Sequence, residues 1–357
     1  MASPLHATAF GPGDRGPNFV LPDAEGRLLM FYERVRGNPF ALLFLGDLPS
    51  GGEARRTLAG FAARQERFAV AGFDLFAVVV GESAVAGSAA AESGARFLIF
   101  ADPKAKITGG YCAPAGFPAS GPACFLFDAN QRLLAAGAAA ADSADWAFDR
   151  LAALSPPTPV QTVSGIAPVL MVPRVIDPAL CQALIQRWEA HHEEGTVGSV
   201  ISDNEIDRVY DAMKRRRDHR IEDPALHAEL AQLIGRRIAP ELDKAFLFRE
   251  FRFDRFLVTC YDAGRGDYFR RHRDNLSPST VDRRIALTLN LNTEDFTGGE
   301  LCFPEYGPQR YRPQTGAAIL FSCSLIHEAL PVTEGRRFTL LSFLRDRPQG
   351  ERPPTGG

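Results

Sequence analysis

The stretch GAAILFSCSLIHEALPVTEGRRFTL, residues 316–340, decides the fold expected for the C-terminal half of this chain. It contains the apolar run Ala317 to Phe321 and a turn leading to His327. A Gly-Arg-Arg sequence then precedes a second apolar run, which begins at Phe338 and continues past the stretch to Leu344. Short apolar runs separated by Gly, Pro and acidic residues are typical of the strands of a β-sandwich or barrel. The stretch therefore predicts two strands with His327 between them.

The same pattern extends upstream as far as Arg252. Three further apolar runs predict strands at Phe256 to Tyr261, Ile285 to Leu291 and Glu300 to Phe303. Together the five runs predict an all-β sandwich or barrel over this part of the chain.

Two helices are expected ahead of these strands. The Asp-Pro pairs at 177–178 and 223–224 each supply an N-terminal cap and a proline for the first helical turn. Each pair is followed by a stripe of apolar residues at helical spacing: Leu180, Leu184, Ile185 and Trp188 in one, and Leu226, Leu230, Leu233, Ile234 and Ile238 in the other. We expect both helices to pack on the larger β body.

The N-terminal half has a different pattern, in which apolar runs alternate with segments that suit helices. Strands are expected at residues 40–45, 73–80, 97–100 and 124–127, and helices at 57–71, 84–93 and 146–154. This alternation is typical of an α/β layer fold.

A stretch rich in Pro, Ser and Thr, SPPTPVQTVS at residues 155–164, separates the two halves. We therefore expect domains at residues 1–155 and 166–347, joined by a linker at 156–165. The polar, Pro- and Gly-rich end at 348–357 is expected to be a disordered tail.

Length and composition agree with a two-domain globular protein. With 357 residues, the chain exceeds the size at which a single hydrophobic core usually stops growing. Its net charge of −3 gives no electrostatic reason to expect nucleic acid or an anionic membrane as a partner. No apolar stretch approaches a membrane span and no secretory leader is recognisable, so a cytoplasmic location is the default expectation.

Cysteines and basic residues have simple interpretations. The six cysteines are scattered without a CxxC pair, so reduced and mostly buried thiols are expected. The basic run Lys214 to Arg217 is interpreted as a solvated face, with a substrate-contacting loop as the alternative. Substrate selectivity is expected to reside in the loops at 199–220 and 275–284.

Three polar residues suggest a metal site in the β part. His272 and Asp274 lie two residues apart in the segment YDAGRGDYFRRHRDN (261–275), so their side chains share one face of an extended chain. His327 is distant in sequence but within reach if the strands close into a barrel. Two imidazoles and one carboxylate form the facial triad of iron(II) oxygenases, which leaves coordination positions open. A His near an Asp is more often a simple hydrogen-bonded pair, so this motif alone is weak evidence.

The residues after the distal histidine add weight. Arg337 lies in EGRRFTLLSF, on the next predicted strand. Its planar guanidinium could pair bidentately with a carboxylate deep in the barrel.

Taken in order, the motifs HRD, RRIALTLNLN, FTGGELCFPEYG and the stretch quoted first closely resemble the prolyl 4-hydroxylase-like branch of the 2-oxoglutarate- and iron(II)-dependent oxygenases. The resemblance covers about residues 251–345 and extends less specifically back to Ile166. It implies a double-stranded β-helix (jelly-roll) core. In that core His272, Asp274 and His327 would hold the iron, and Arg337 would grip the distal carboxylate of 2-oxoglutarate.

The resemblance also bears on neighbouring residues. Arg336 is less suited to the grip because it should point to the opposite face of the strand, whereas Thr339 shares the face of the grip and would add a hydrogen bond. Tyr261 corresponds to an aromatic position at the pocket, with a cosubstrate or substrate contact and barrel packing as equal alternatives. For Tyr268 and Asn290, packing or surface roles are favoured.

The N-terminal half is similar to a peroxiredoxin-type thioredoxin fold. The resemblance rests on GDRGPNFVLPDAEGR, NPFALLFLG, FDLFAVVVG, FLIFADP and ACFLFDANQRLLAAG, and it covers most of residues 10–155. That family places a peroxidatic cysteine just after the first long strand, where this chain has GDLPSGGEARRTLAG (46–60) without a cysteine. Peroxide reduction by the usual route is therefore not expected, Cys112 and Cys124 are interpreted as buried thiols, and the domain is interpreted as a non-catalytic scaffold.

The leading hypothesis is a 2-oxoglutarate- and Fe(II)-dependent dioxygenase that hydroxylates an amino acid, a peptidyl side chain or a natural product and releases succinate and CO2. Its cofactors would be Fe(II), 2-oxoglutarate and O2, with ascorbate as a stimulant. The alternative is a non-catalytic protein that binds or senses metal and 2-oxoglutarate through the same residues. Besides a small-molecule or peptidyl substrate, the N-terminal domain would bind a protein partner or a second copy of the chain.

Overall fold

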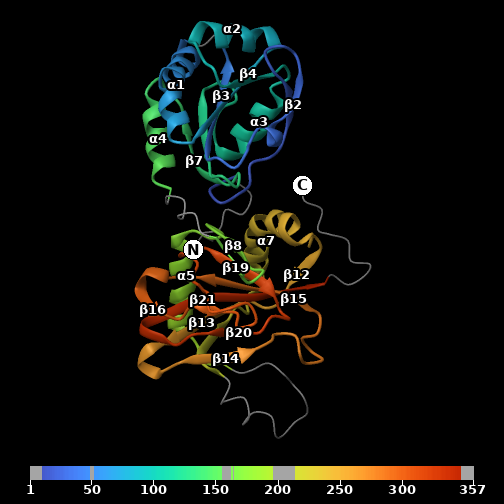
Figure 1. Ribbon diagram of the computed structural model, residues 1–357, viewed down its shortest axis with the longest axis vertical. Coiled ribbons are helices and arrows are strands. Elements are labelled where there is room, and N and C mark those ends of the chain that lie inside the picture. Colours follow the sequence, from blue (N-terminus) through green and yellow to red (C-terminus); the bar gives the residue numbers. More distant parts are fainter. Residues whose placement is uncertain (1–9, 49–51, 155–161, 164, 196–213, 347–357) are drawn as a thin grey trace. The chain divides into compact units, whose positions relative to one another are not determined.

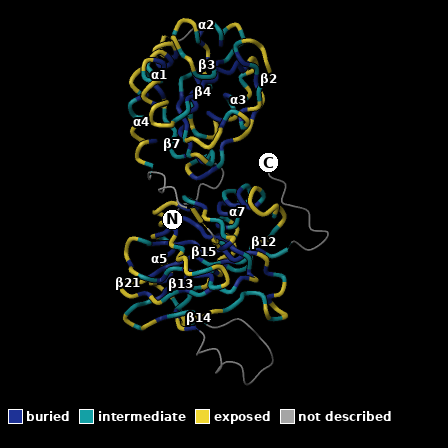
Figure 2. Tube along the Cα trace, viewed as in Figure 1, coloured by how far each residue is buried: buried dark blue, intermediate teal, exposed yellow. Residues whose placement is uncertain are grey.

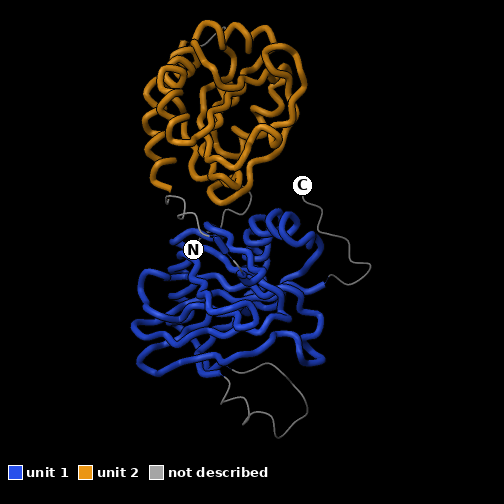
Figure 3. The backbone as a smooth tube through the Cα atoms, in the orientation of Figure 1, with its two compact units in different colours: residues 1–7, 161–357 blue, residues 8–160 orange. Residues whose placement is uncertain are grey.

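The computed structural model describes residues 10–48, 52–154, 162–163, 165–195 and 214–346. One compact unit spans Thr8–Val160 and the other spans Gln161–Gly357, as Figure 3 shows by colour. The predicted tail at 348–357 and most of the predicted linker at 156–165 lie outside the described residues, so the domain boundaries remain predictions.

The N-terminal unit is a layered α/β fold around one sheet with the strand order β5-β4-β3-β6-β7 (Figure 1). Strands β3, β4 and β5 are parallel, while β6 and β7 add antiparallel pairs. The strands run over Phe40–Asp47 (β3), Asp74–Val80 (β4), Leu98–Asp102 (β5), Ala123–Phe127 (β6) and Leu133–Ala138 (β7). This is the thioredoxin-like architecture predicted from the sequence.

Helices cover both faces of this sheet, so its central strands are apolar on both sides. Helices α1 (Gly52–Val70), α2 (Ser83–Ser93) and α4 (Ser143–Ala152) pack on one face. Helix α3 (Lys106–Cys112) and the hairpin of β1 (Val20–Pro22) and β2 (Leu28–Met30) pack on the other. Figure 2 shows the buried centre that results.

The cysteines of this unit are buried as expected. Cys112 and Cys124 are fully buried and unpaired. Burial raises the pKa of Cys112 to about 11 and the pKa of Cys124 further still, so neither thiol ionises readily at neutral pH. Both therefore lack the thiolate character of a redox centre.

The C-terminal unit consists of two packed antiparallel sheets, the jelly-roll arrangement predicted from the sequence. Among the described residues, the larger sheet has the order β8-β19-β15-β21-β13-β11-β9, with β12 and β16 also paired to β21. Its strands are Leu170–Val172 (β8), Ala318–Ser322 (β19), Arg283–Asn290 (β15), Val332–Asp346 (β21), Leu257–Asp262 (β13), Arg217–Arg220 (β11), Glu193–Glu194 (β9), Phe251–Phe253 (β12) and Phe296–Gly298 (β16).

The smaller sheet has the order β10-β14-β20-β17-β18. Its strands are Lys214–Arg215 (β10), Tyr268–His272 (β14), His327–Ala329 (β20), Leu301–Cys302 (β17) and Arg310–Tyr311 (β18). Across the described chain, 3-10 helices lie at Phe31–Glu33, Ala113–Ala115, Ala263–Arg265 and Thr293–Asp295.

Two helices cover the outer face of the larger sheet (Figure 1). Helix α5 (Pro178–Ala190) begins where the Asp177 carboxylate accepts from the Leu180 amide, and α7 (Pro224–Phe246) begins where Asp223 accepts from the Ala225 amide. Both predicted caps are confirmed, and both apolar stripes are buried. None of the helices in the described parts of the chain has the length and apolarity needed to cross a membrane.

Alternation along the strands of the larger sheet sorts their side chains between two environments. On β21, Phe338 and Leu340 pack beneath the helices. Arg337, Thr339 and Leu341 instead face inward and line a cavity between the two sheets. The sheet thus separates an apolar outer core from a cavity lined by both polar and apolar side chains.

We expect Trp188→Ala to lower the free energy of unfolding of the C-terminal unit by about 3–5 kcal/mol, measured by urea denaturation. Trp188 is 1% exposed, packs edge-on against Phe338 and donates from Nε1 to the Arg217 carbonyl at 3.2 Å. Val281→Ala is the control, because Val281 is 63% exposed and its truncation should change stability by less than about 0.5 kcal/mol. Equal effects of the two changes would contradict this account of the core.

Candidate metal and cosubstrate site

The three predicted metal ligands come together on the smaller sheet. His272 ends β14 and His327 begins β20, and the antiparallel register places them directly opposite each other. Asp274 lies two residues beyond His272, where its backbone amide donates to the Cys323 carbonyl at 3.0 Å. One ligand atom from each side chain lies within 4.8 Å of the other two. The chain pairing, rather than local sequence, brings the distant histidine to the pair.

Hydrogen bonds orient both imidazoles toward the carboxylate. The Nδ1 atom of His272 lies 2.7 Å from the Arg270 carbonyl, and Nδ1 of His327 lies 3.1 Å from the Leu325 carbonyl. If each Nδ1 carries the proton, each Nε2 presents a lone pair, and both Nε2 atoms lie 3.4 Å from an Asp274 carboxylate oxygen. The Nε2 atom of His272 is buried without a hydrogen bond, as a ligand atom awaiting a metal would be.

Burial and neighbouring side chains give His327 and Asp274 the protonation states that metal ligands require. Burial lowers the pKa of His327, which keeps this imidazole neutral. Burial alone would raise the pKa of Asp274, but the adjacent side chains of His327 and His272 lower it on balance. A neutral imidazole and an ionised carboxylate are the ligand forms. Two nitrogen donors and one hard oxygen donor therefore fit a divalent iron.

The cavity beside these ligands has a volume of about 420 Å3 and lies between the two sheets. Arg337 reaches it from β21 and is 3% exposed, while its neighbour Arg336 is exposed and paired with Glu189 at 3.1 Å. The only hydrogen bond that Arg337 makes to a described residue is a long one, 3.3 Å to Oδ1 of Asn290, and its Nε has no partner. Burial lowers its pKa to about 10, so Arg337 keeps its charge at neutral pH.

Tyr261 and Thr339 line the same cavity as Arg337. Tyr261 pairs with Arg337 in the register of β13 and β21, and the guanidinium carbon lies 5.6 Å from its ring centroid. The Thr339 hydroxyl is hydrogen-bonded to that of Thr259 at 2.7 Å. Asn290 is buried near Arg337, whereas Tyr268 is not among the cavity-lining residues.

A family model described as the 2OG-Fe(II) oxygenase superfamily matches residues 256–345, which include every residue of the site described above. The C-terminal unit carries a 2OG-Fe(II) oxygenase domain. Domains of this family use Fe(II), 2-oxoglutarate and dioxygen.

Curated relatives of the oxygenase domain include PKHD-type hydroxylases. One from Synechococcus is 35% identical over 97 residues, which are 25% of this chain and 42% of that protein. One from Shewanella baltica is 30% identical over 152 residues, which are 40% of this chain and 66% of that protein. The chain thus spans less than half of the length of the Synechococcus relative.

Solved structures resemble each half of the chain separately. A prolyl-4-hydroxylase from Pseudomonas putida covers 51% of this chain and 94% of its own, at 20% identity and a TM-score of 0.38. The peroxidoxin BcpB from Mycobacterium tuberculosis covers 41% of this chain and 98% of its own, at 16% identity and a TM-score of 0.36.

Part of the wall of the oxygenase domain's cavity was not expected from the sequence. The interpretation of residues 214–217 as a solvated face is wrong for Lys214 and Arg216, which are 7% and 5% exposed and line the cavity. Arg216 donates to the Tyr261 hydroxyl at 2.9 Å and pairs with Asp218, whose carboxylate also binds Lys214. Burial lowers the pKa of Lys214 to about 7. The spacing of two between these polar residues is the strand signal that could have identified them.

Both loops expected to govern selectivity contribute to the cavity, and Lys214 and Arg216 come from the loop at 199–220. Leu276, Ser277, Thr280 and Arg283, from the loop at 275–284, also line the cavity. Most of the loop at 199–220 lies outside the described residues.

The Gly-Gly pair of the FTGGEL motif permits a close approach to Arg337. Gly299 has a φ of +71°, and a Cβ atom there would lie 2.9 Å from Cδ of Arg337 and 3.0 Å from Cγ2 of Val332. An added methyl group would therefore press on the stem of the buried arginine.

We expect Gly299→Ala to weaken 2-oxoglutarate binding by about tenfold, measured by calorimetry, because a displaced Arg337 loses part of a charge-assisted contact. Gly266→Ala is the matched control, because Gly266 has a similar φ of +64° but no atom within 4 Å of an added Cβ. Equal losses in both variants would show that backbone strain, rather than the contact with Arg337, is responsible.

Proposed function

We propose that this protein is a 2-oxoglutarate- and Fe(II)-dependent dioxygenase that hydroxylates a small-molecule or peptidyl substrate and releases succinate and CO2. The observation that carries the proposal is the joint presence, in one cavity, of His272, Asp274, His327 and the buried Arg337. A metal site alone would suit many activities. A buried cation that forms no ion pair with a described carboxylate, in the same cavity as that site, specifically suits a dicarboxylate cosubstrate.

The roles of the residues follow from their positions. His272, Asp274 and His327 would hold the metal, and bound Fe(II) would supply the oxidative chemistry that protein side chains lack. Three ligands on one side leave the other side of the site open toward the cavity. A protein carboxylate among the ligands favours hydroxylation over halogenation, which needs that coordination position for halide.

Arg337 would orient 2-oxoglutarate by pairing bidentately with the carboxylate remote from the metal. Thr339, on the same face of β21, would add a hydrogen bond. Tyr261 is held by Arg216 and would limit sideways movement of the cosubstrate. Together these groups would fix one orientation of the dicarboxylate.

Apolar walls would keep the reacting centre dry. Phe269 stacks on His272 with ring centroids 3.5 Å apart, and Phe321 packs edge-on against His327 at 4.7 Å. Leu341 and Phe343 continue the apolar lining along β21. Exclusion of water strengthens the electrostatic contacts within such a site and protects reactive intermediates.

The N-terminal unit is proposed to be a non-catalytic scaffold. The segment at 46–60 contains no cysteine. The two cysteines of the N-terminal unit, Cys112 and Cys124, are buried and have raised pKa values. The N-terminal unit would bind a protein partner or a second copy of the chain. We further propose a cytoplasmic location, where reduced thiols and Fe(II) are compatible.

Succinate formation tests the enzyme class. The full-length protein, reconstituted with Fe(II) and ascorbate in air, should release succinate from 2-oxoglutarate. His272→Ala and Asp274→Ala should each abolish this release and weaken iron binding, because each removes one of three ligands. His191→Ala, at an exposed histidine, is the control. Stoichiometric iron binding without succinate, with or without pooled metabolites and peptides, would instead support the metal- and 2-oxoglutarate-sensing alternative.

Arg337→Ala should raise the 2-oxoglutarate concentration needed for half-maximal succinate formation by about 10- to 100-fold, since a hydrogen bond to a charged group contributes about 1.5–3 kcal/mol. Arg336→Ala is the matched control, because it removes the same charge from the exposed face of the same strand. A larger effect at Arg336 would transfer the proposed grip to that residue.

A further inference from the structure

A second arginine, Arg255, lines the cavity, and its guanidinium forms no hydrogen bond or ion pair with a described residue. It lies two residues before β13, whereas Arg337 is in register with Tyr261 near the other end of that strand. Six residues of extended chain separate Arg255 from Tyr261, or about 20 Å at 3.3 Å per residue. The two arginines are therefore anchored toward opposite ends of β13, and only Arg337 is in register with Tyr261.

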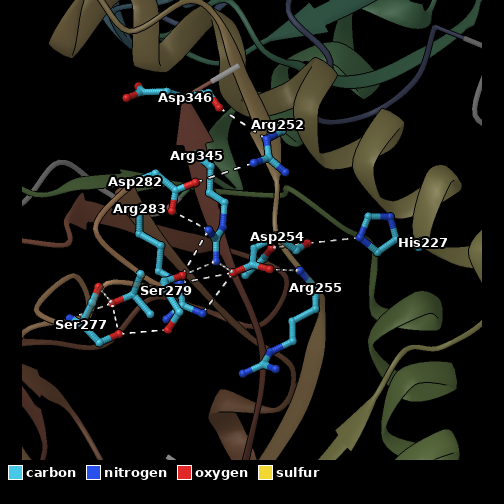
Figure 4. A network of polar contacts seen from close by, with 12 residues as sticks. His227, Arg252, Asp254, Arg255, Ser277, Ser279, Asp282, Arg283, Arg345 and Asp346 are labelled. Carbon is cyan, nitrogen blue, oxygen red and sulfur yellow. Dashed lines mark hydrogen bonds and ion pairs between the residues drawn. The ribbon is translucent and has the colours of Figure 1, made fainter. Parts of the chain in front are cut away.

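A network around Asp254 fixes the backbone that carries Arg255 (Figure 4). The Asp254 amide donates to the Phe343 carbonyl at 2.8 Å, and its own carbonyl accepts from Ser342 at 3.2 Å and lies 3.1 Å from Nε2 of His227. These three contacts join β21, α7 and the start of β13. The base of the Arg255 side chain is therefore held in place.

The same network uses the carboxylate that Arg255 would otherwise pair with. One Asp254 oxygen accepts from Arg283 at 3.0 Å and from Arg345 at 2.8 Å, and the other accepts from the Arg255 backbone amide at 2.8 Å. Figure 4 shows the Arg255 side chain pointing away from this carboxylate, with no dashed line to its guanidinium. Its Nε is buried without a hydrogen bond.

Apart from Arg337, the other cations that line the cavity have acidic partners. Arg271 pairs with Glu328 at 3.2 Å and Arg273 with Glu305 at 2.8 Å, while Arg283, Arg216 and Lys214 pair with Asp254 or Asp218. Among the described residues no ion pair involves Arg255. Burial and the nearby charges of Arg220 and Arg283 lower its pKa on balance, although the charges of Asp254 and Asp218 act in the opposite direction.

We infer that Arg255 binds a carboxylate of the primary substrate, an inference that rests on the proposed oxygenase function. The guanidinium presents two parallel donors that match a carboxylate, and one unpaired positive charge matches a monoanion. Leu257, Leu341 and Phe343 line the same cavity as this arginine and the metal ligands. The structure therefore assigns a substrate with an apolar portion near the metal and a carboxylate beyond it.

Calorimetry on the full-length protein, loaded with Mn(II) and 2-oxoglutarate so that no turnover occurs, tests the inference. The probes are the twenty L-amino acids, their C-terminally free dipeptides with alanine, and straight-chain C4 to C8 acids. Each probe is titrated as the carboxylate and as the carboxamide, and the C4 to C8 chains also as phosphate monoesters. These arms separate a free acid, a peptide C-terminus and a phosphate as the source of negative charge.

At least one carboxylate should bind, with its amide at least about tenfold weaker, and Arg255→Gln should reduce carboxylate affinity by about tenfold or more. Arg255→Lys keeps the positive charge but lacks the two parallel N–H donors of the guanidinium, so it should recover part of the lost affinity. Arg252→Gln is the matched control, because Arg252 is exposed, lies three residues away and does not line the cavity. Thermal unfolding of each variant verifies that it is folded.

Several results would overturn the inference while leaving the proposed function intact. These are equal binding of acid and amide, preference for the phosphate, equal losses in the Arg252 and Arg255 variants, or no bound carboxylate although Mn(II) and 2-oxoglutarate bind. An equal loss of 2-oxoglutarate affinity in Arg255→Gln would also overturn it. Failure of the wild-type protein to bind Mn(II) and 2-oxoglutarate would instead overturn the proposed function, and this inference with it.

Discussion

The register of β21 is the constraint on which the rest of the oxygenase domain depends. This strand is hydrogen-bonded to β12, β13, β15 and β16, and in the part paired with β13 and β15 its odd-numbered residues from Arg337 to Phe343 line the cavity. A slip of one residue would exchange Arg337 for Arg336 and turn Phe338 and Leu340 away from the helices. The burial of the apolar face therefore also fixes the position of the charged group.

Much of this arrangement could be predicted from the sequence because its signals are local. The Asp-Pro caps located α5 and α7, and the apolar runs located β13, β15, β19 and β21. Strand alternation, together with the family resemblance, separated Arg337 from Arg336. The pairing of His272 with His327 also depended on resemblance, because nothing local to either residue specifies a partner so distant in sequence.

Other features could not be predicted because they depend on neighbours from elsewhere in the chain. Lys214 and Arg216 are in a basic run that suits solvent, yet β10 and β11 are paired with β14 and β13 at the cavity wall, where Asp218 and Tyr261 compensate the charges. Likewise, Arg255 has no local pattern that distinguishes it from Arg252. Only the pairing of the Asp254 carboxylate with Arg283 and Arg345 shows that the Arg255 guanidinium forms no ion pair with a described residue.

The three proposed ligands come from two segments that are distant in sequence, one ending β14 and one beginning β20. A metal held by all three would act as a cross-link that closes the intervening chain into a loop, and it would bind only the folded form. Iron supply would then govern the lifetime of the domain as well as its chemistry. An iron-poor cell would hold a larger unfolded fraction of this protein, exposed to proteolysis.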